Sequence, residues 1–147
     1  MAVNANHGEY EISTDPQRID VAAVHAFLAQ SYWSPGIPRE VVERAIANSL
    51  CFGVYRGAQQ AGFARVVTDK ATFAYLADVF VLEPHRGKGL SKWLMAFITG
   101  HEALQGLRRF LLATKDAHGL YAQFGFEALA NPSRMMESLK PDIYCRS

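Results

Sequence analysis

A glycine-rich turn between a predicted strand and a predicted helix restricts the fold of this chain more than any other feature. Residues 79–91 read VFVLEPHRGKGLS, an apolar strand-like run, a turn and the start of an apolar helix. The first N–H groups of a helix have no intrahelical partner, and the helix dipole places partial positive charge there. Gly87 and Gly89 allow close approach of an anion, and Arg86 and Lys88 add positive charge. The segment predicts a diphosphate site, with an ordinary basic turn as the alternative.

The turn differs from two common phosphate-binding motifs. It lacks the Gly-Lys-Ser/Thr ending of a Walker-type loop, and the chain has no Gly-x-Gly-x-x-Gly fingerprint of a dinucleotide-binding fold. It resembles the acetyl-CoA site of the GCN5-related N-acetyltransferase (GNAT) superfamily, whose signature is Gln/Arg-x-x-Gly-x-Gly/Ala. Arg86, Gly89 and Ser91 take those three places. Ser91 departs from the signature, but its small hydroxyl fits a crowded helix start and can cap it.

A second motif lies about 30 residues further along. Residues 120–126, LYAQFGF, resemble the Leu-Tyr-x-x-x-Gly-Phe ending of the same family. In that family the tyrosine hydroxyl faces the thioester sulfur, which gives Tyr121 the role of general acid; packing on a short amphipathic helix is the alternative. The resemblance covers Tyr10 to Leu139, and the order and spacing of the two motifs favour the catalytic role.

The bulk composition predicts one globular domain, residues 1–147, with its core at about 9–139. Half of the residues are hydrophobic and 20% are charged, as in ordinary globular proteins. The net charge of +1 does not indicate a nucleic-acid-binding protein, and no apolar run is long enough to cross a bilayer. Scattered histidines and two cysteines predict neither a metal site nor a disulfide framework, with Cys51 a buried small residue. We expect a cytoplasmic protein.

Hydrophobic periodicity predicts a mixed order of strands and helices, with a meander of antiparallel strands. That order matches the arrangement of the family, which implies an α+β (α/β) fold with helices on both faces of a mainly antiparallel central sheet. The family resemblance adds two parallel central strands that splay apart, with the pantetheine arm of the cofactor between them. Asp15 is predicted to cap the first helix and Pro38 to open the second, while His101 continues the apolar stripe of a helix that begins at Leu90 and ends at Gly106. The predicted strands are Glu9–Thr14, Leu50–Arg56, Gln60–Thr68, Thr72–Leu82, Phe110–Thr114 and Arg134–Leu139, and the short tyrosine helix is Ala117–Phe124.

The resemblance also supplies a set of cofactor-binding residues. Backbone N–H groups of the turn and the two basic side chains would hold the diphosphate, and the strand before the turn would bind pantetheine and supply an oxyanion donor. Asp116 takes the place where many family members have an Asn near the pantetheine. The full predicted set is Phe80, Val81, Leu82, Arg86, Gly87, Lys88, Gly89, Leu90, Ser91 and Asp116.

Acyl transfer to an amine also needs proton transfers. The pKa of a free tyrosine is about 10, so Tyr121 holds a proton that it can give to a departing thiolate. Asp78 is the candidate general base because it lies on an otherwise apolar strand face, where lost hydration favours proton uptake. Pairing with a basic side chain or capping of a loop is the alternative for Asp78, and many family members use a water chain instead. Tyr32 and Trp33 are predicted to border the acceptor pocket, with core packing as the alternative for Trp33.

The predicted function is an N-acetyltransferase in which a primary amine of a small molecule or peptide attacks the thioester of acetyl-CoA directly. The alternatives are a transferase that uses another acyl-CoA, and a non-catalytic acyl-CoA-binding regulatory module. Retention of both motifs favours an enzyme. The sequence leaves the acceptor and a possible homodimer open, and it predicts neither nucleic acid nor membrane as a partner.

Overall fold

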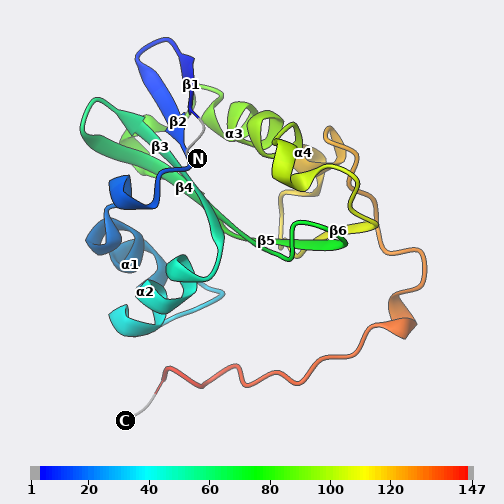
Figure 1. Cartoon of the computed structure of the whole chain (residues 1–147). Coiled ribbons are helices and arrows are strands. Elements are labelled where there is room, and N and C mark those ends of the chain that lie inside the picture. The colour runs from blue at the N-terminus through cyan, green and yellow to red at the C-terminus, as the bar shows by residue number, and fades with distance from the viewer. Residues whose placement is uncertain (1–3, 146–147) are drawn as a thin grey trace.

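One six-stranded sheet passes through the molecule, and its strands follow one another in the order of the chain. The computed structural model describes residues 4–145. Figure 1 shows α1 and α2 on one face of the sheet and α3 and α4 on the other. The strands are β1 (Asn4–His7), β2 (Tyr10–Ser13), β3 (Leu50–Arg56), β4 (Gln59–Thr68), β5 (Phe73–Val81) and β6 (Arg109–Leu112). The helices are α1 (Val21–Ala29), α2 (Arg39–Ala47), α3 (Leu90–Thr99) and α4 (His118–Ala122), with 3₁₀ turns at Pro16–Arg18, Glu83–His85, Glu102–Leu104 and Pro132–Arg134.

The predicted mixed fold class is confirmed, and the strand pairing is antiparallel except at one place. β1 to β5 form an antiparallel meander, and β6 pairs parallel to β5. The β5–β6 crossover runs through α3, as expected for a β–helix–β unit. The parallel register runs from Phe73↔Arg109 to Leu76↔Leu112 and stops there, although β5 continues to Val81. The two parallel strands therefore part beyond Leu76, as the family resemblance implies.

The C-terminal strand predicted at Arg134–Leu139 is wrong. Pro132–Arg134 forms a 3₁₀ turn, and the residues that follow are extended but pair with no strand among the described residues. Residues 134–139 contain no β-branched or aromatic side chain, so little favours a pleated pairing. Without this strand, β6 is the last strand of the sheet. The two parallel strands therefore lie at an end of the sheet and not at its centre.

Several other boundaries differ from the predictions for identifiable reasons. The Asp15 carboxylate accepts the N–H of Gln17, but the turn that it caps is a single 3₁₀ turn. Helix α1 begins only after Asp20, whose carboxylate accepts the N–H of Ala23. Helix α3 ends at Thr99, well before Gly106. Beyond it, His101 accepts the N–H of Ala103 through Nδ1 and begins a 3₁₀ turn.

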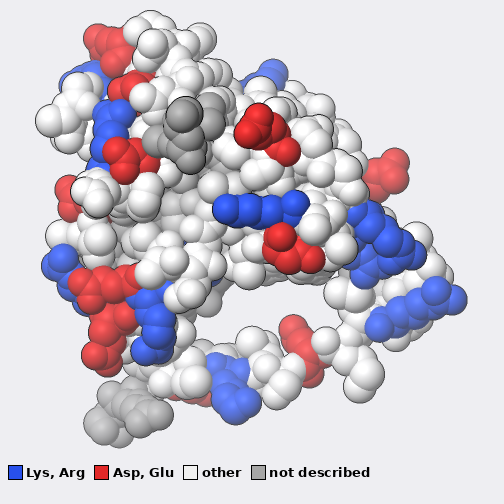
Figure 2. Space-filling view, viewed as in Figure 1, with Lys and Arg blue, Asp and Glu red and all other residues white. Residues whose placement is uncertain are grey.

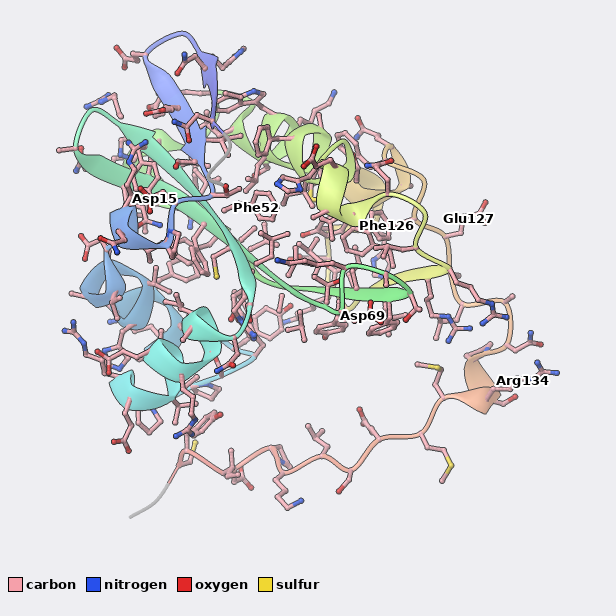
Figure 3. The ribbon with its side chains drawn as sticks, in the orientation of Figure 1. Asp15, Phe52, Asp69, Phe126, Glu127 and Arg134 are labelled. Atoms are coloured by element: carbon pink, nitrogen blue, oxygen red, sulfur yellow. The ribbon has the colours of Figure 1, made fainter. Side chains whose placement is uncertain are left out.

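Two apolar clusters hold the helices to the sheet. On the α3 side, Phe52 is fully buried and contacts the rings of Phe97 and His101 edge to face (Figure 3). His101 is thus a partly buried packing residue, as predicted, although it lies outside the helix. On the α1–α2 side, a second cluster contains Phe63, Phe80 and the buried Cys51. Burial raises the pKa of the Cys51 thiol to about 12.

The first strand of the structure was absent from the sequence prediction. β1 pairs with β2 across a turn at Gly8, whose φ is +60°. Its residues Asn4–His7 are polar and mostly exposed, so they carry no hydrophobic periodicity. In residues 4–145 no helix is long and apolar enough to cross a membrane. Lys, Arg, Asp and Glu are interspersed on the face shown in Figure 2, in keeping with the small net charge.

Candidate active site

The glycine-rich turn has the conformation that an anion site at a helix start requires. Gly87 and Gly89 have φ values of +79° and +75°, which side-chain-bearing residues adopt only with strain. Gly89 is the N-cap of α3 and no side chain caps the helix, so Ser91 does not have the capping role that its hydroxyl allows. A Cβ added at Gly87 or at Gly89 would have no atom within 4 Å. There is therefore free space beside both glycines at the uncapped start of α3.

Two contacts hold this turn against the sheet. The Arg86 Nε donates to the carbonyl of Val81 at 2.9 Å, so the guanidinium braces the turn against the end of β5. His85 is buried, and its Nδ1 lies 2.9 Å from the hydroxyl of Tyr10 on β2. No role for His85 was predicted from the sequence. The buried His85 therefore attaches the turn to Tyr10 of β2.

A cavity of about 740 Å³ opens where β5 and β6 part. Its lining includes Leu76 to Val79 of β5 and Leu112 to Ala117 at and beyond the end of β6. It also reaches residues of α1, α2 and their connection on the other face of the sheet. The slot between the parallel strands is thus continuous with the space near the α1–α2 connection.

Tyr121 lines this cavity from α4. Its side chain is buried, and Phe126 contacts its ring at 6.2 Å between centroids. Gly125, with a φ of +89°, turns the chain back so that Phe126 can pack against both Tyr121 and Phe110 of β6. The Tyr121 hydroxyl makes no hydrogen bond to any residue of the described chain. Burial, and to a smaller extent nearby Tyr32, raises the pKa of Tyr121, so the hydroxyl keeps its proton at neutral pH.

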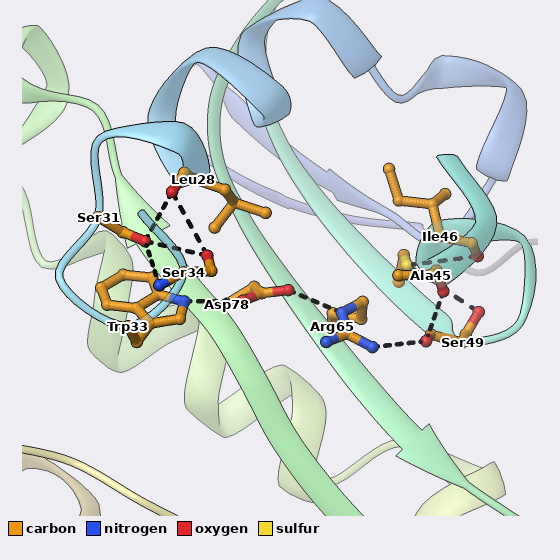
Figure 4. A network of polar contacts seen from close by, with 10 residues as sticks. Leu28, Ser31, Trp33, Ser34, Ala45, Ile46, Ser49, Arg65 and Asp78 are labelled. Carbon is orange, nitrogen blue, oxygen red and sulfur yellow. Dashed lines mark hydrogen bonds and ion pairs between the residues drawn. The ribbon is translucent and has the colours of Figure 1, made fainter. Parts of the chain in front are cut away.

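Asp78 lies at an irregular position of β5 and has two nitrogen partners. Its φ of +55° accompanies a shift of the β4–β5 register between Phe63 and Arg65. Its Oδ2 accepts Arg65 Nε at 2.8 Å, and its Oδ1 accepts Trp33 Nε1 at 2.8 Å (Figure 4). Pairing with a basic side chain is the alternative that the sequence analysis left open for Asp78. The same carboxylate faces the cavity, so its position alone does not exclude the role of base.

The α1–α2 connection presents two aromatic side chains to the cavity. Ser31 is buried, donates to Leu28 O and accepts the N–H of Ser34, which gives the connection a defined shape (Figure 4). Tyr32 is 62% exposed and Trp33 is 42% exposed, so neither is a core residue. Lys115, beyond β6, lies 5.4 Å from the centre of the Tyr32 ring.

The structure brings most of the predicted residues to one cavity but gives some of their atoms other partners. Tyr121, Asp78, Asp116, Tyr32 and Trp33 all line it. On the strand before the turn, the N–H of Leu82 donates to Ala61 O, and the carbonyl of Val81 accepts from Arg86. The Phe80 ring stacks on Phe27 within the second apolar cluster. The glycine-rich turn and the start of α3 contain the six residues for which a diphosphate site was predicted, Arg86, Gly87, Lys88, Gly89, Leu90 and Ser91.

Arg65 and Tyr144 also line the cavity and were not predicted as site residues from the sequence. Arg65 is a lone charge within the apolar run of β4, and an isolated charge in such a run signals a paired or functional group. Tyr144 reaches the cavity from the C-terminal segment and packs against the α1–α2 cluster. No sequence signal connects Tyr144 to the site, because the contact depends on the path of the chain after α4.

Comparison with known proteins identifies similar folds and sequences. Residues 47–128 match the sequence model of the acetyltransferase (GNAT) domain. A putative acetyltransferase of Gibberella zeae is 34% identical, over 82% of this chain and 80% of that protein. The crystal structure of a putative GNAT-family acetyltransferase from Xanthomonas campestris is 49% identical, with a TM-score of 0.92 over 96% of this chain and 99% of that one. A predicted acetyltransferase of Clostridium acetobutylicum, solved with acetyl-CoA, shares the fold at 14% identity and a TM-score of 0.65, over 95% and 96% of the two chains.

Proposed function

Because the chain belongs to the GNAT family of acetyltransferases, we propose that it transfers the acetyl group of acetyl-CoA to a primary amine of a small molecule or peptide. The observation that carries this proposal is the continuous cavity between the parting strands and the α1–α2 connection. A direct transfer needs the amine and the thioester of acetyl-CoA to lie next to each other in one space. The similar fold solved with acetyl-CoA supports the choice of cofactor.

The diphosphate would bind at the start of α3. The uncapped N–H groups after Gly89 provide donors, and the dipole of a helix that runs to Thr99 favours an anion there. Lys88 is exposed beside these groups and adds positive charge. Arg86 is proposed to act mainly through the turn, because its Nε already donates to Val81 O. The pantetheine would then enter the slot beyond Leu76, and Asp116 borders that slot.

The chemical step requires two proton transfers around the attack of the amine nitrogen on the thioester carbon. As the carbon–sulfur bond breaks, the thiolate takes the proton of Tyr121, whose hydroxyl has no competing partner in residues 4–145. The attacking amine must lose a proton. Asp78 already accepts from Arg65 and Trp33, so we propose that water in the cavity takes this proton and that Asp78 holds the acceptor wall in place.

The acceptor would enter past the two exposed aromatic side chains, Tyr32 and Trp33. Their rings lie 5.1 Å apart, edge to face, at the mouth shared with Lys115. Aromatic faces bind cationic and flat apolar groups. An amine attached to an apolar or aromatic body therefore fits this entrance better than a highly polar acceptor.

The first experiment tests cofactor binding. Acetyl-CoA and CoA should raise the melting temperature of the protein, as any ligand of the native state does. Gly89→Asp would place a carboxylate at the proposed diphosphate position and should abolish the shift. Gly57→Asp is the matched control, because Gly57 also has a positive φ with no atom near its missing Cβ, but it lies in the β3–β4 turn. Equal shifts in both variants would contradict the assignment.

The second experiment tests the reaction itself. Purified protein is incubated with acetyl-CoA and a panel of primary amines that differ in apolar and aromatic content, and free thiol release is measured. We expect turnover with at least one amine and none after Gly89→Asp. Cofactor binding without turnover on any small or peptide amine would favour the non-catalytic acyl-CoA-binding module. Faster release from a longer acyl-CoA would favour the other transferase.

A further inference from the structure

The mouth of the cavity holds a lysine without a charged partner. Lys115, in the segment beyond β6, lines the cavity and is exposed, and its ammonium group forms no ion pair with any residue of the range 4–145. Its Nζ lies 5.4 Å from the centre of the Tyr32 ring. Attraction between a cation and an aromatic face favours this position, so a positive charge is available at the entrance to the cavity.

The other charges of the cavity wall are either paired or lie beside the cofactor slot. The charged residues of the lining are Arg65, Asp78, Lys115 and Asp116. Arg65 and Asp78 neutralise each other through an ion pair of 2.8 Å (Figure 4). Asp116 is exposed and borders the slot proposed for the pantetheine, and it forms no ion pair with its neighbour Lys115. Among the lining residues that the structure describes, Lys115 is therefore the cation left for a ligand.

The wall of the cavity toward α1 and α2 is apolar. Val24, Leu28 and Val42 line it, and all three side chains are buried in the second cluster. Tyr32 and Trp33 stand at its entrance with their ring centres 5.1 Å apart. Such a surface favours an apolar or aromatic body, because binding removes apolar area from water. The ligand of this part of the cavity should therefore combine an apolar body with a group that pairs with Lys115.

Tyr32 lies close both to Lys115 and to the proposed proton donor. Its ring faces the Lys115 ammonium group, and it is near enough to Tyr121 to contribute to the raised pKa of that residue. Because Tyr121 is proposed to protonate the departing thiolate, the thioester would lie beside it. An acceptor that lies along the Tyr32 ring would then have its amine near the thioester and its other end near Lys115. The group at that other end should be an anion.

We propose that the acceptor is an amine that carries a carboxylate on an apolar or aromatic body, and that Lys115 determines this specificity by binding the carboxylate. The inference rests on the proposed acetyl transfer and adds the class of acceptor. A carboxylate accepts charge-assisted hydrogen bonds from an ammonium group, and these are stronger than hydrogen bonds between neutral groups. An acceptor with a second cation in place of the carboxylate would be repelled by Lys115, so the same residue also excludes polyamine-like acceptors.

The test compares para-aminomethylbenzoate with its methyl ester, because the two compounds share the amine and the ring and differ in the negative charge. Thiol release is measured at saturating acetyl-CoA for the parent, Lys115→Met, Lys115→Arg and the control Lys140→Met. Lys140 is exposed and does not line the cavity. In the parent, KM for the acid should be about tenfold lower than KM for the ester, as one charge-assisted hydrogen bond implies. Lys115→Met should remove this preference without a change in kcat, whereas Lys115→Arg and Lys140→Met should keep it.

Calorimetric titration of the CoA-bound protein with the same two compounds gives a readout that does not depend on turnover. Lys115-dependent preference for the acid without turnover of any amine would support the carboxylate site and refute the proposed acetyl transfer. Equal KM values for acid and ester in the parent, or an unchanged preference in Lys115→Met, would overturn the inference and leave the acetyl transfer standing. Failure of the acid to bind would also overturn it. So would a raised KM for acetyl-CoA in Lys115→Met with an unchanged KM for the acid, because Lys115 would then belong to the cofactor site.

Discussion

Replacement of Tyr121 by Phe tests the proposed chemistry most directly, because it removes one hydroxyl and keeps the ring. The ring packs against Phe126, and this contact is unchanged in the variant. The hydroxyl has no hydrogen-bond partner in the described chain, so we expect the free energy of unfolding to change by no more than about 0.5 kcal/mol. Loss of general-acid help typically slows a reaction by about 10²–10⁴-fold, which corresponds to about 3–5 kcal/mol of transition-state stabilisation.

The assay is steady-state thiol release with the best amine of the panel, for the parent and for Tyr121→Phe. If the proton transfer occurs only in the transition state, kcat and kcat/KM should fall by the same factor, and the affinity for CoA should not change. If Tyr121 is the general acid, activity requires its protonated form, and burial raises the pKa of this group. The activity that depends on Tyr121 should therefore persist to pH 10 and be lost only above the ordinary tyrosine range.

Two results would refute this reasoning. The first is parental turnover in Tyr121→Phe, which would return Tyr121 to the packing role that the sequence left open. The second is a fall in turnover accompanied by a large loss of stability or of CoA affinity. That outcome would mean that the hydroxyl shapes the site and does not donate a proton.

Three other perturbations have expected outcomes. Asp78→Asn keeps an acceptor for Trp33 but leaves the mostly buried Arg65 without its ion-pair partner. We expect a stability loss of about 3 kcal/mol in urea unfolding and a fall in kcat of less than about tenfold. A larger fall in kcat with parental stability would make Asp78 the base. Tyr55→Phe removes a buried hydroxyl without a hydrogen bond and should stabilise the protein by about 1 kcal/mol. Burial raises the pKa of Tyr55 to about 12, so the folded protein holds this proton more tightly than the unfolded chain does. The resulting contribution to the free energy of unfolding is complete below pH 10 and is lost as the pH rises to 12. Tyr55→Phe has no such group, so the variant should lose less stability than the parent over that pH window. Gly36 has a φ of +75°, and a Cβ added there would lie 2.9 Å from the Tyr144 carbonyl oxygen. Gly36→Ala should therefore lower the free energy of unfolding by about 1–2 kcal/mol in the same assay and speed hydrogen exchange near Tyr144. Unchanged exchange would show that this contact does not hold the C-terminal segment.

Strong local signals explain what the sequence predicted of the fold. β3, β4 and β5 are apolar runs bounded by turn residues, and the positive φ values of Gly57 and Lys70 lie at the turns that were expected. The two errors at the ends of the sheet have the opposite cause. β1 is polar, so only its pairing with β2 defines it, whereas residues 134–139 pair with no strand among the described residues.

In the candidate site, too, features set by local sequence could be predicted, and contacts between distant elements could not. The glycine-rich turn is local, so its glycines and its position before α3 could be predicted from residues 86–91. The partners of Asp78 could not, because Arg65 and Trp33 come from two other elements and meet it across an irregularity in the β4–β5 pairing. The position of Tyr144 at the cavity could not be predicted either, because it depends on the path of the C-terminal segment after α4.

The contact between His85 and Tyr10 has a consequence for anyone who trims this protein to the segment that matches the acetyltransferase domain. The segment that matches the acetyltransferase domain, residues 47–128, contains His85 but not Tyr10. A fragment cut to that segment would leave a buried imidazole without its hydroxyl partner directly before the glycine turn. Such a fragment would keep every residue of the cofactor signature and still bind the cofactor poorly, because the turn would have lost its attachment to the second strand. We therefore expect that a fragment able to bind the cofactor must include Tyr10.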